Sequence, residues 1–145
     1  MIELKEDDIV YKLAPNVSRL DDIEIPENAT VFDATNCQNF HDLKGLAKHP
    51  NLRVLLLKNT AIDSLDFSYI SENVEDIDIR QCRGIRSLQR FPIRTEKPLR
   101  VQIHFVGERI LRTVPSYIDL EIDGFFRTIS QRRQNVFCEN QKSRE

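Results

Sequence analysis

A short apolar pattern recurs along the chain at intervals of 22 or 23 residues, and it constrains the fold more than any other feature. Glu27–Leu43 and Glu72–Leu88 share a Glu-Asn start, a cysteine and a closing leucine at the same offsets. Leu52–Leu65 lies between them and follows the same plan with one residue fewer. The first, fourth, sixth and ninth places of the three units are Ala29, Phe32, Ala34 and Cys37; Leu52, Leu55, Leu57 and Thr60; Val74, Ile77, Ile79 and Cys82.

This spacing predicts stacked β-strands. The fourth and sixth places are two residues apart, so their side chains point to one face of a short strand. One unit cannot bury that face alone, whereas stacked units form a parallel sheet over a continuous core. At the ninth place the chain bends away, and a small side chain that can form hydrogen bonds fits there.

The pattern L-x-x-L-x-L-x-x-(N/C/T) resembles the leucine-rich repeat. The resemblance implies an α/β solenoid of about 3–5 repeats with terminal caps, a curved parallel sheet on the concave side and short helices or irregular segments on the convex side. It also implies a non-enzymatic module or adaptor that binds a partner protein on the concave sheet. The chain departs from the family in its few leucines, its lack of an Asn ladder and its degenerate outer repeats. The alternative is an ordinary α/β domain in which two strands look alike.

We expect a single domain over 1–145, with an N-terminal cap over 1–28 and three clear repeats over 29–97. In the cap, Ile9, Val10 and Leu13 seed a short helix or strand, and an alternating strand follows at Leu20, Ile23 and Ile25. An edge strand or hairpin here would cover the first core layer. In the first repeat's connection, Leu43, Leu46 and Ala47 have helical spacing.

The C-terminal part predicts degenerate repeats or a cap over 98–129, then a polar tail over 130–145. Leu99–Phe105 alternates, with Val101 and Ile103 in the fourth and sixth places. Tyr117–Ile122 also alternates, and it forms either a fifth strand or an antiparallel terminal hairpin.

Charge and cysteine usage favour an intracellular, cytoplasmic protein without a membrane span. The net charge of −2 gives no general attraction to nucleic acid or membranes. The N-terminus carries acids where a signal peptide needs an apolar run. Cys37 and Cys82 are expected about 10 Å apart, beyond disulfide reach. With Cys138 in the polar tail, we expect three reduced thiols.

Side chains between the inward pair form the predicted binding face. Its candidate partner-binding residues are Val54, Leu56, Lys58, Asp78, Arg80, Gln102 and His104. Val54 and Leu56 are apolar where the pattern asks for polar residues, and Lys58, Arg80 and His104 form a basic row that suggests a partner with an acidic segment. The alternative is that the charges only aid solubility and that a terminal segment covers Val54 and Leu56.

No catalytic, metal or cofactor site is predicted. Asp33 and Asp78 are expected about 10 Å apart, too far to share a metal ion. His41, His49 and His104 have no His or Cys partner at ligand spacing. Nucleic-acid binding through Arg132–Arg133 is disfavoured because no aromatic platform accompanies them. A microbial effector, a subunit of a larger assembly, or an enzyme with an unrecognised site stay as alternatives, and the oligomeric state is open.

Overall fold

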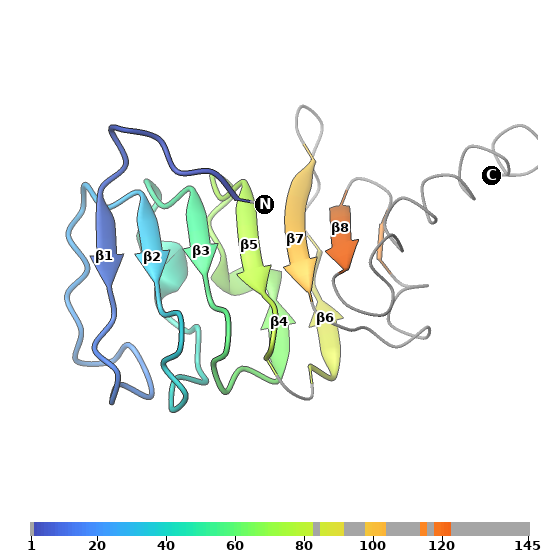
Figure 1. The fold of residues 1–145 in the computed structure, drawn as a ribbon, viewed down its shortest axis with the longest axis horizontal. Coiled ribbons are helices and arrows are strands. Elements are labelled where there is room, and N and C mark those ends of the chain that lie inside the picture. The colour runs from blue at the N-terminus through green and yellow to red at the C-terminus, as the bar shows by residue number, and fades with distance from the viewer. Residues whose placement is uncertain (1, 83–84, 92–97, 104–113, 116–117, 123–145) are drawn as a thin grey trace, which may run out of the picture.

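A computed structural model describes residues 2–82, 85–91, 98–103, 114–115 and 118–122. Six short strands lie side by side in one parallel sheet (Figure 1). In sheet order they are β1 (Val10–Lys12), β2 (Val31–Asp33), β3 (Val54–Leu56), β5 (Asp76–Ile79), β7 (Leu99–Ile103) and β8 (Ile118–Ile122). The chain therefore winds as a parallel-strand solenoid of about four turns.

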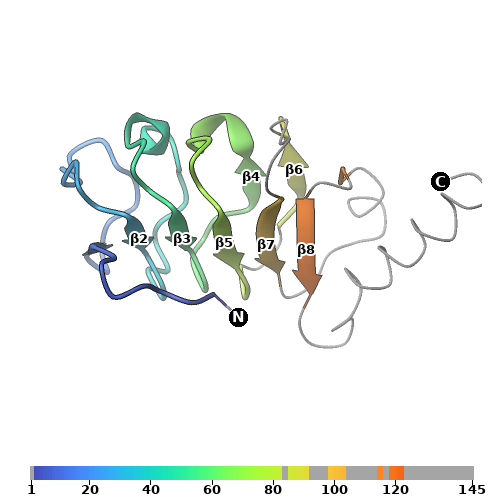
Figure 2. The ribbon, with the colours of Figure 1, turned by 90° about the horizontal axis from the view of Figure 1, so that it is seen from above.

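The return segments carry a second, smaller sheet on the other side of the core (Figure 2). Its two parallel strands are β4 (Ser64–Asp66) and β6 (Ser87–Gln89). Two single-turn 3-10 helices also lie in return segments, η1 (Leu46–Lys48) and η2 (Phe67–Tyr69). The core fills the space between these segments and the six-stranded sheet.

The strand register follows the predicted places of the repeat. Phe32, Leu55, Ile77, Val101 and Leu120 are successive Cα partners across the sheet. All five side chains are at most 1% exposed and belong to one hydrophobic core. The C-terminal strand is parallel to its neighbour, so the fifth-strand alternative is confirmed and the antiparallel hairpin is wrong.

The N-terminal segment contains a strand, which confirms the strand alternative predicted for Ile9, Val10 and Leu13, but this strand belongs to an additional repeat unit that the sequence analysis did not predict. β1 pairs parallel with β2, and Tyr11 and Leu13 take the fourth and sixth places of an additional unit. The strand predicted over Leu20–Ile25 is wrong, because those residues form turns and irregular backbone. Their apolar side chains pack against the core from the return segment instead.

The α/β class with convex helices is not confirmed, because the described residues contain 3-10 turns and no α-helix. Gly45 adopts a φ of 100° just before η1, which breaks the helical spacing of Leu43 and Leu46. Pro50 follows shortly afterwards and restricts the backbone of His49. A single turn is all that fits between these two residues.

A row of left-handed residues turns the chain after β2, β3 and β5. Asn36, Asn59 and Gln81 occupy the same eighth place and have φ values of 67°, 58° and 59°. Asn tolerates this conformation better than most residues. The Asn59 Nδ2 donates to Asn36 Oδ1 at 2.9 Å, which joins successive turns. This asparagine link lies at the eighth place, one residue before the ninth place, where the sequence analysis had noted that no Asn ladder is present.

The ninth-place side chains satisfy buried carbonyl groups, as the sequence predicts. Cys82 Sγ donates to the Leu57 carbonyl at 3.0 Å, and Thr60 Oγ1 donates to the same carbonyl at 2.9 Å. Cys37 Sγ lies 3.6 Å from the Leu13 carbonyl one turn earlier. Cys37 and Cys82 are free and buried, which confirms the prediction that these two thiols form no disulfide. Cys138 lies outside the described residues. Burial raises the pKa of both thiols.

Candidate functional site

The candidate site is the face of the six-stranded sheet that points away from the core, which we name the front face. Two rows of side chains cross it, one near the start of each strand and one near its end. The upper row holds the third-place residues Val10, Val31, Val54, Asp76, Arg100 and Asp119. The lower row holds the fifth-place residues Lys12, Asp33, Leu56, Asp78, Gln102 and Glu121.

The upper row is covered near β2 and β3. Val31 and Val54 are 0% exposed, yet neither belongs to the core cluster between the sheets. Residues 2–8 cross the front face over the upper ends of these strands (Figures 1 and 2). We name residues 2–8 the N-terminal strap. The prediction that Val54 is exposed is wrong, because its side chain is 0% exposed. The path of the strap agrees with the alternative of a covering terminal segment (Figures 1 and 2).

The strap is fixed by a partly buried ion pair. Arg53 Nη2 lies 2.5 Å from Asp8 Oδ2, and the two side chains are only 15% and 5% exposed. Asp8 also accepts from Thr30 Oγ1 at 2.8 Å and from the Lys5 backbone N–H at 2.6 Å. Burial acts to raise the pKa of Asp8, but the hydrogen bonds from Lys5, Thr30 and Arg53 outweigh it and lower the pKa. The attachment of the strap therefore depends mainly on the Asp8 carboxylate being ionised.

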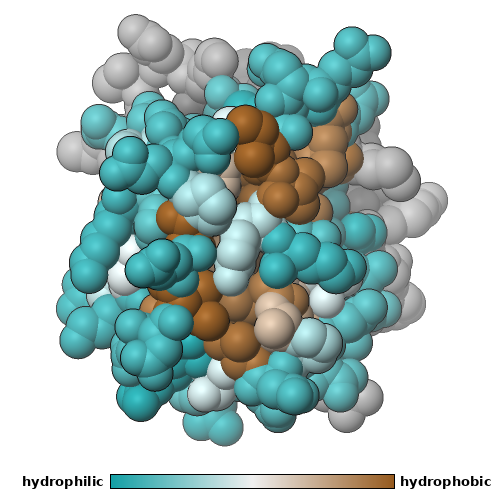
Figure 3. Space-filling view, turned by 90° about the vertical axis from the view of Figure 1, so that its left-hand side faces the viewer, coloured by the Kyte–Doolittle hydropathy of each residue, from teal (hydrophilic) through white to brown (hydrophobic). Residues whose placement is uncertain are grey.

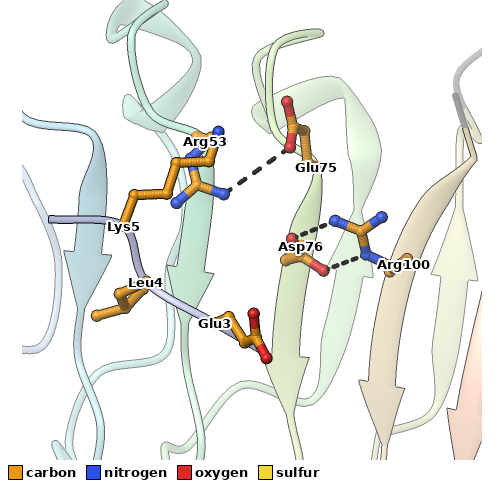
Figure 4. Close-up of a pocket in the computed structure, with 7 residues that line it drawn as sticks. All are labelled: Glu3, Leu4, Lys5, Arg53, Glu75, Asp76 and Arg100. Atoms are coloured by element: carbon orange, nitrogen blue, oxygen red, sulfur yellow. Dashed lines mark hydrogen bonds and ion pairs between the residues drawn. The ribbon is translucent and has the colours of Figure 1, made fainter. Parts of the chain in front are cut away.

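Between the strap and the upper ends of β3, β5 and β7 lies an open hollow of about 340 Å³ (Figure 4). Its cationic side chains from the sheet are already paired. Arg100 holds Asp76 with two hydrogen bonds of 2.6 and 2.7 Å, and Arg53 lies 3.8 Å from Glu75. Because these arginines are already paired with carboxylates, the hollow has little free positive charge from the sheet with which to bind a ligand.

The predicted basic row of Lys58, Arg80 and His104 carries less free positive charge in the structure than the sequence suggested, because Arg80 is paired. Arg80 Nε and Nη2 both donate to the Asp78 carboxylate at 2.9 Å, and the Arg80 backbone N–H donates to it at 3.0 Å. Asp78 is buried by these contacts. Lys58 has no ion pair among the described residues, and His104 lies outside them. Within the described residues, the row therefore consists of Lys58, which has no ion pair, and Arg80, whose charge Asp78 neutralises.

Leu56 is the apolar member of the lower row. It is half-buried, lies at the end of β3 and has Asp33 and Asp78 as its Cα partners on the neighbouring strands. Further along the row, Gln102 is buried and donates to Glu121 at 3.2 Å. The structure thus brings Leu56, Lys58, Asp78 and Arg80 together on one surface and leaves Val54 beneath the strap.

Two residues of this face, Asp8 and Arg53, were missed by the sequence analysis. A signal was present, because Asp8 takes the first place of its unit, where the next three units have Ala29, Leu52 and Val74. A carboxylate at a place that is otherwise apolar indicates a buried cationic partner. Arg53 could not be identified as that partner without the path of the strap.

The described residues hold no group of three or more His, Cys, Asp and Glu side chains arranged to bind a metal ion. Within the same ranges, no helix is long and apolar enough to cross a membrane. Comparison with models of known protein families, with curated proteins and with solved structures finds no match.

Proposed function

We propose that the protein is a non-enzymatic binding module, built on a leucine-rich-repeat-like solenoid, that holds a partner protein on the lower row of the front face. The observation that carries this proposal is Leu56, a half-buried aliphatic side chain in the middle of an otherwise polar row. Hydrogen-bonded strands hold it in place, so a partner meets a preformed surface and loses little entropy in ordering it.

The charges around Leu56 favour a partner segment that combines an apolar residue with acidic ones. Lys12 and Lys58 have no ion pair within the described residues, whereas Asp78 already neutralises Arg80. Lys58 follows Leu56 two residues later on the same segment, and Lys12 lies in the lower row two strands away, beyond Asp33. An acidic segment crossing the lower row would meet these two ammonium groups near Leu56. Charge complementarity of this kind mainly accelerates association and selects the partner. The free, buried thiols support an intracellular location for this module.

The test is affinity capture from the native host, followed by titration of the captured protein against variants. Leu56→Glu should weaken binding at least about tenfold, because it places an unpaired charge at an apolar contact. Lys58→Glu should slow association, and the wild-type association rate should fall as salt rises. Arg80→Glu is unsuitable, because it would set a second carboxylate against Asp78.

Lys44→Glu is the matched control for Lys58→Glu, since it makes the same charge change at an exposed residue of a return segment. It should leave affinity unchanged. Wild-type affinity in a folded Leu56→Glu, Lys58→Glu double variant would contradict the proposal and assign recognition to another surface.

A further inference from the structure

The first turn of the solenoid ends in an open sheet edge. β1 has β2 as its single neighbour in the sheet. The Ile9 carbonyl accepts from Val31 N–H at 3.1 Å and Leu13 N–H donates to the Asp33 carbonyl at 2.8 Å, so alternate backbone groups face β2. In a parallel ladder the N–H and C=O groups of Val10 and Lys12 then point away from β2. Within the described residues nothing pairs with them.

Apolar side chains surround this edge. Ile9 and Val10 are 42% and 47% exposed, and they are two of the four large apolar side chains that the described residues expose. Tyr11, Val17 and Ile23 are only partly buried against the core at the same end. Figure 3 views this end of the molecule and shows apolar areas bounded by hydrophilic side chains. An unpaired edge beside apolar surface is the usual template for adding another strand.

The sequence of the edge is complementary to itself in the antiparallel direction. If two copies pair about Val10, Val10 faces Val10, Ile9 faces Tyr11, and Lys12 faces Asp8 next to Asp7. Lys12 has no ion pair in its own chain within the described ranges. Asp8 is already held by Arg53 of its own chain, so the exposed Asp7 of the second copy would supply the partner. Parallel pairing in register would instead place Lys12 beside Lys12. The charges therefore select the antiparallel arrangement.

We propose that two copies of this chain associate through β1 about a two-fold axis and join their six-stranded sheets edge to edge. A two-fold contact is closed, so it removes both exposed edges without producing a fibre. Val10 lies at the axis, where its N–H and C=O bond to those of the second copy. The Leu56 surface of each copy remains open, and Lys12 takes part both in this association and in the binding proposed for the lower row.

Sedimentation equilibrium between about 1 and 200 µM is the primary test, since it covers the range expected of a small interface. The wild type should form a dimer in this range. Val10→Lys, which adds a charge at an exposed edge residue, should raise the dimer dissociation constant at least about tenfold. Lys12→Glu should do the same, because it sets a carboxylate against Asp7 and Asp8 of the second copy. Tyr69→Lys makes the same change as Val10→Lys at another exposed apolar residue and should leave the dimer intact.

A cross-link gives a positive test that does not depend on losing association. Directly opposed residues in a hydrogen-bonded antiparallel pair have Cα atoms about 5.5 Å apart, which suits a disulfide. Val10→Cys in a Cys138→Ser background should therefore form an intermolecular disulfide under mild oxidation, since Cys37 and Cys82 are buried. Tyr69→Cys in the same background should not. A wild type that stays monomeric throughout, or a dimer that survives Val10→Lys and fails to cross-link at residue 10, would overturn the proposal.

Discussion

Replacing Asp8 by Asn removes the charge that attaches the strap, together with one of its two acceptor oxygens. Asn has nearly the shape of Asp, and its single oxygen can accept either from Thr30, in the place of Oδ1, or from the Lys5 N–H, in the place of Oδ2. The charge that pairs with Arg53 is lost, although Arg53 is only 15% exposed. We expect the strap to open far more often while the six-stranded sheet stays folded, since the core behind β2 and β3 contains no strap residue.

The magnitude follows from burial and from the second partner of Arg53. Removing one member of a buried ion pair costs about 3–5 kcal/mol when the other is left without compensation. Arg53 retains Glu75 at 3.8 Å, which offsets part of this cost. We therefore expect the free energy of strap opening to fall by about 2 kcal/mol, close to that of one charge-assisted hydrogen bond. This corresponds to about a 30-fold increase in the open population.

Hydrogen exchange measures this opening directly. The Ile9 N–H bonds to Thr30 Oγ1 of the next unit, so it reports directly on whether the strap is seated. The N–H groups of Lys5 and Asp8 bond within the strap, to Asp8 Oδ2 and to the Lys5 carbonyl, and we expect that turn to loosen when Asp8 is released. In the Asp8→Asn variant, exchange at these amides should accelerate about 30-fold, in line with the population change. Asp7→Asn is the matched control, because it changes an exposed neighbour by the same charge. Equal exchange in Asp8→Asn and Asp7→Asn would refute the attachment we describe.

The same attachment should depend on pH with a defined sign. The pKa of Asp8 is lower in the folded protein than in the unfolded chain, where it is about 3.9. The ionised carboxylate therefore stabilises the seated strap above that value, and the stabilisation is lost as pH falls through the folded pKa. Strap protection in the wild type should decline in acid, whereas protection in Asp8→Asn should change little over the same range.

Two further predictions concern the core and the thiols. Leu55→Ala and Ile77→Ala should each lower the free energy of unfolding by about 2–5 kcal/mol in denaturant titrations, because both side chains are 0% exposed, and losses under about 0.5 kcal/mol would contradict the register. Cys82 should react with a thiol reagent slowly in the folded protein and at the rate of an ordinary thiol in denaturant, because burial raises its pKa despite the hydrogen bond with Thr60. Rapid labelling of Cys82 in the folded state would place it on the surface.

The sequence predicted the sheet well because the repeat encodes register locally. A slip of one residue would turn Leu55 and Ile77 outward, so the apolar places define which face each strand buries. The unit around β1 was missed chiefly because Asp8 stands at the first place, where the next three units have Ala29, Leu52 and Val74. Pairing energy with β2 overrides that weak pattern, and Tyr11 stacks on Phe32 with ring centroids 6.1 Å apart.

The candidate site was less predictable because its accessibility depends on contacts distant in sequence. Val54 is followed by Leu55, Leu56 and Leu57, and this run alone does not show which side is covered. The cover comes from residues 2–8, whose path is set by a pair 45 residues apart in the chain, Asp8 and Arg53. Periodicity describes the direction in which a side chain points, but it says nothing of what lies over it.

The two kinds of cation on the front face have separable roles. Arg80 and Arg100 each hold a buried carboxylate with two hydrogen bonds, a geometry that the planar guanidinium forms readily. These arginines neutralise Asp78 and Asp76, which would otherwise be two costly charges on one strand, β5. Lys12 and Lys58 have no such carboxylate among the described residues, and an ammonium on a flexible stem can adapt to a group that arrives from solution. The arginines therefore stabilise the platform, and we propose that the lysines interact with what binds to it, Lys58 on the front face and Lys12 at both the front face and the open edge.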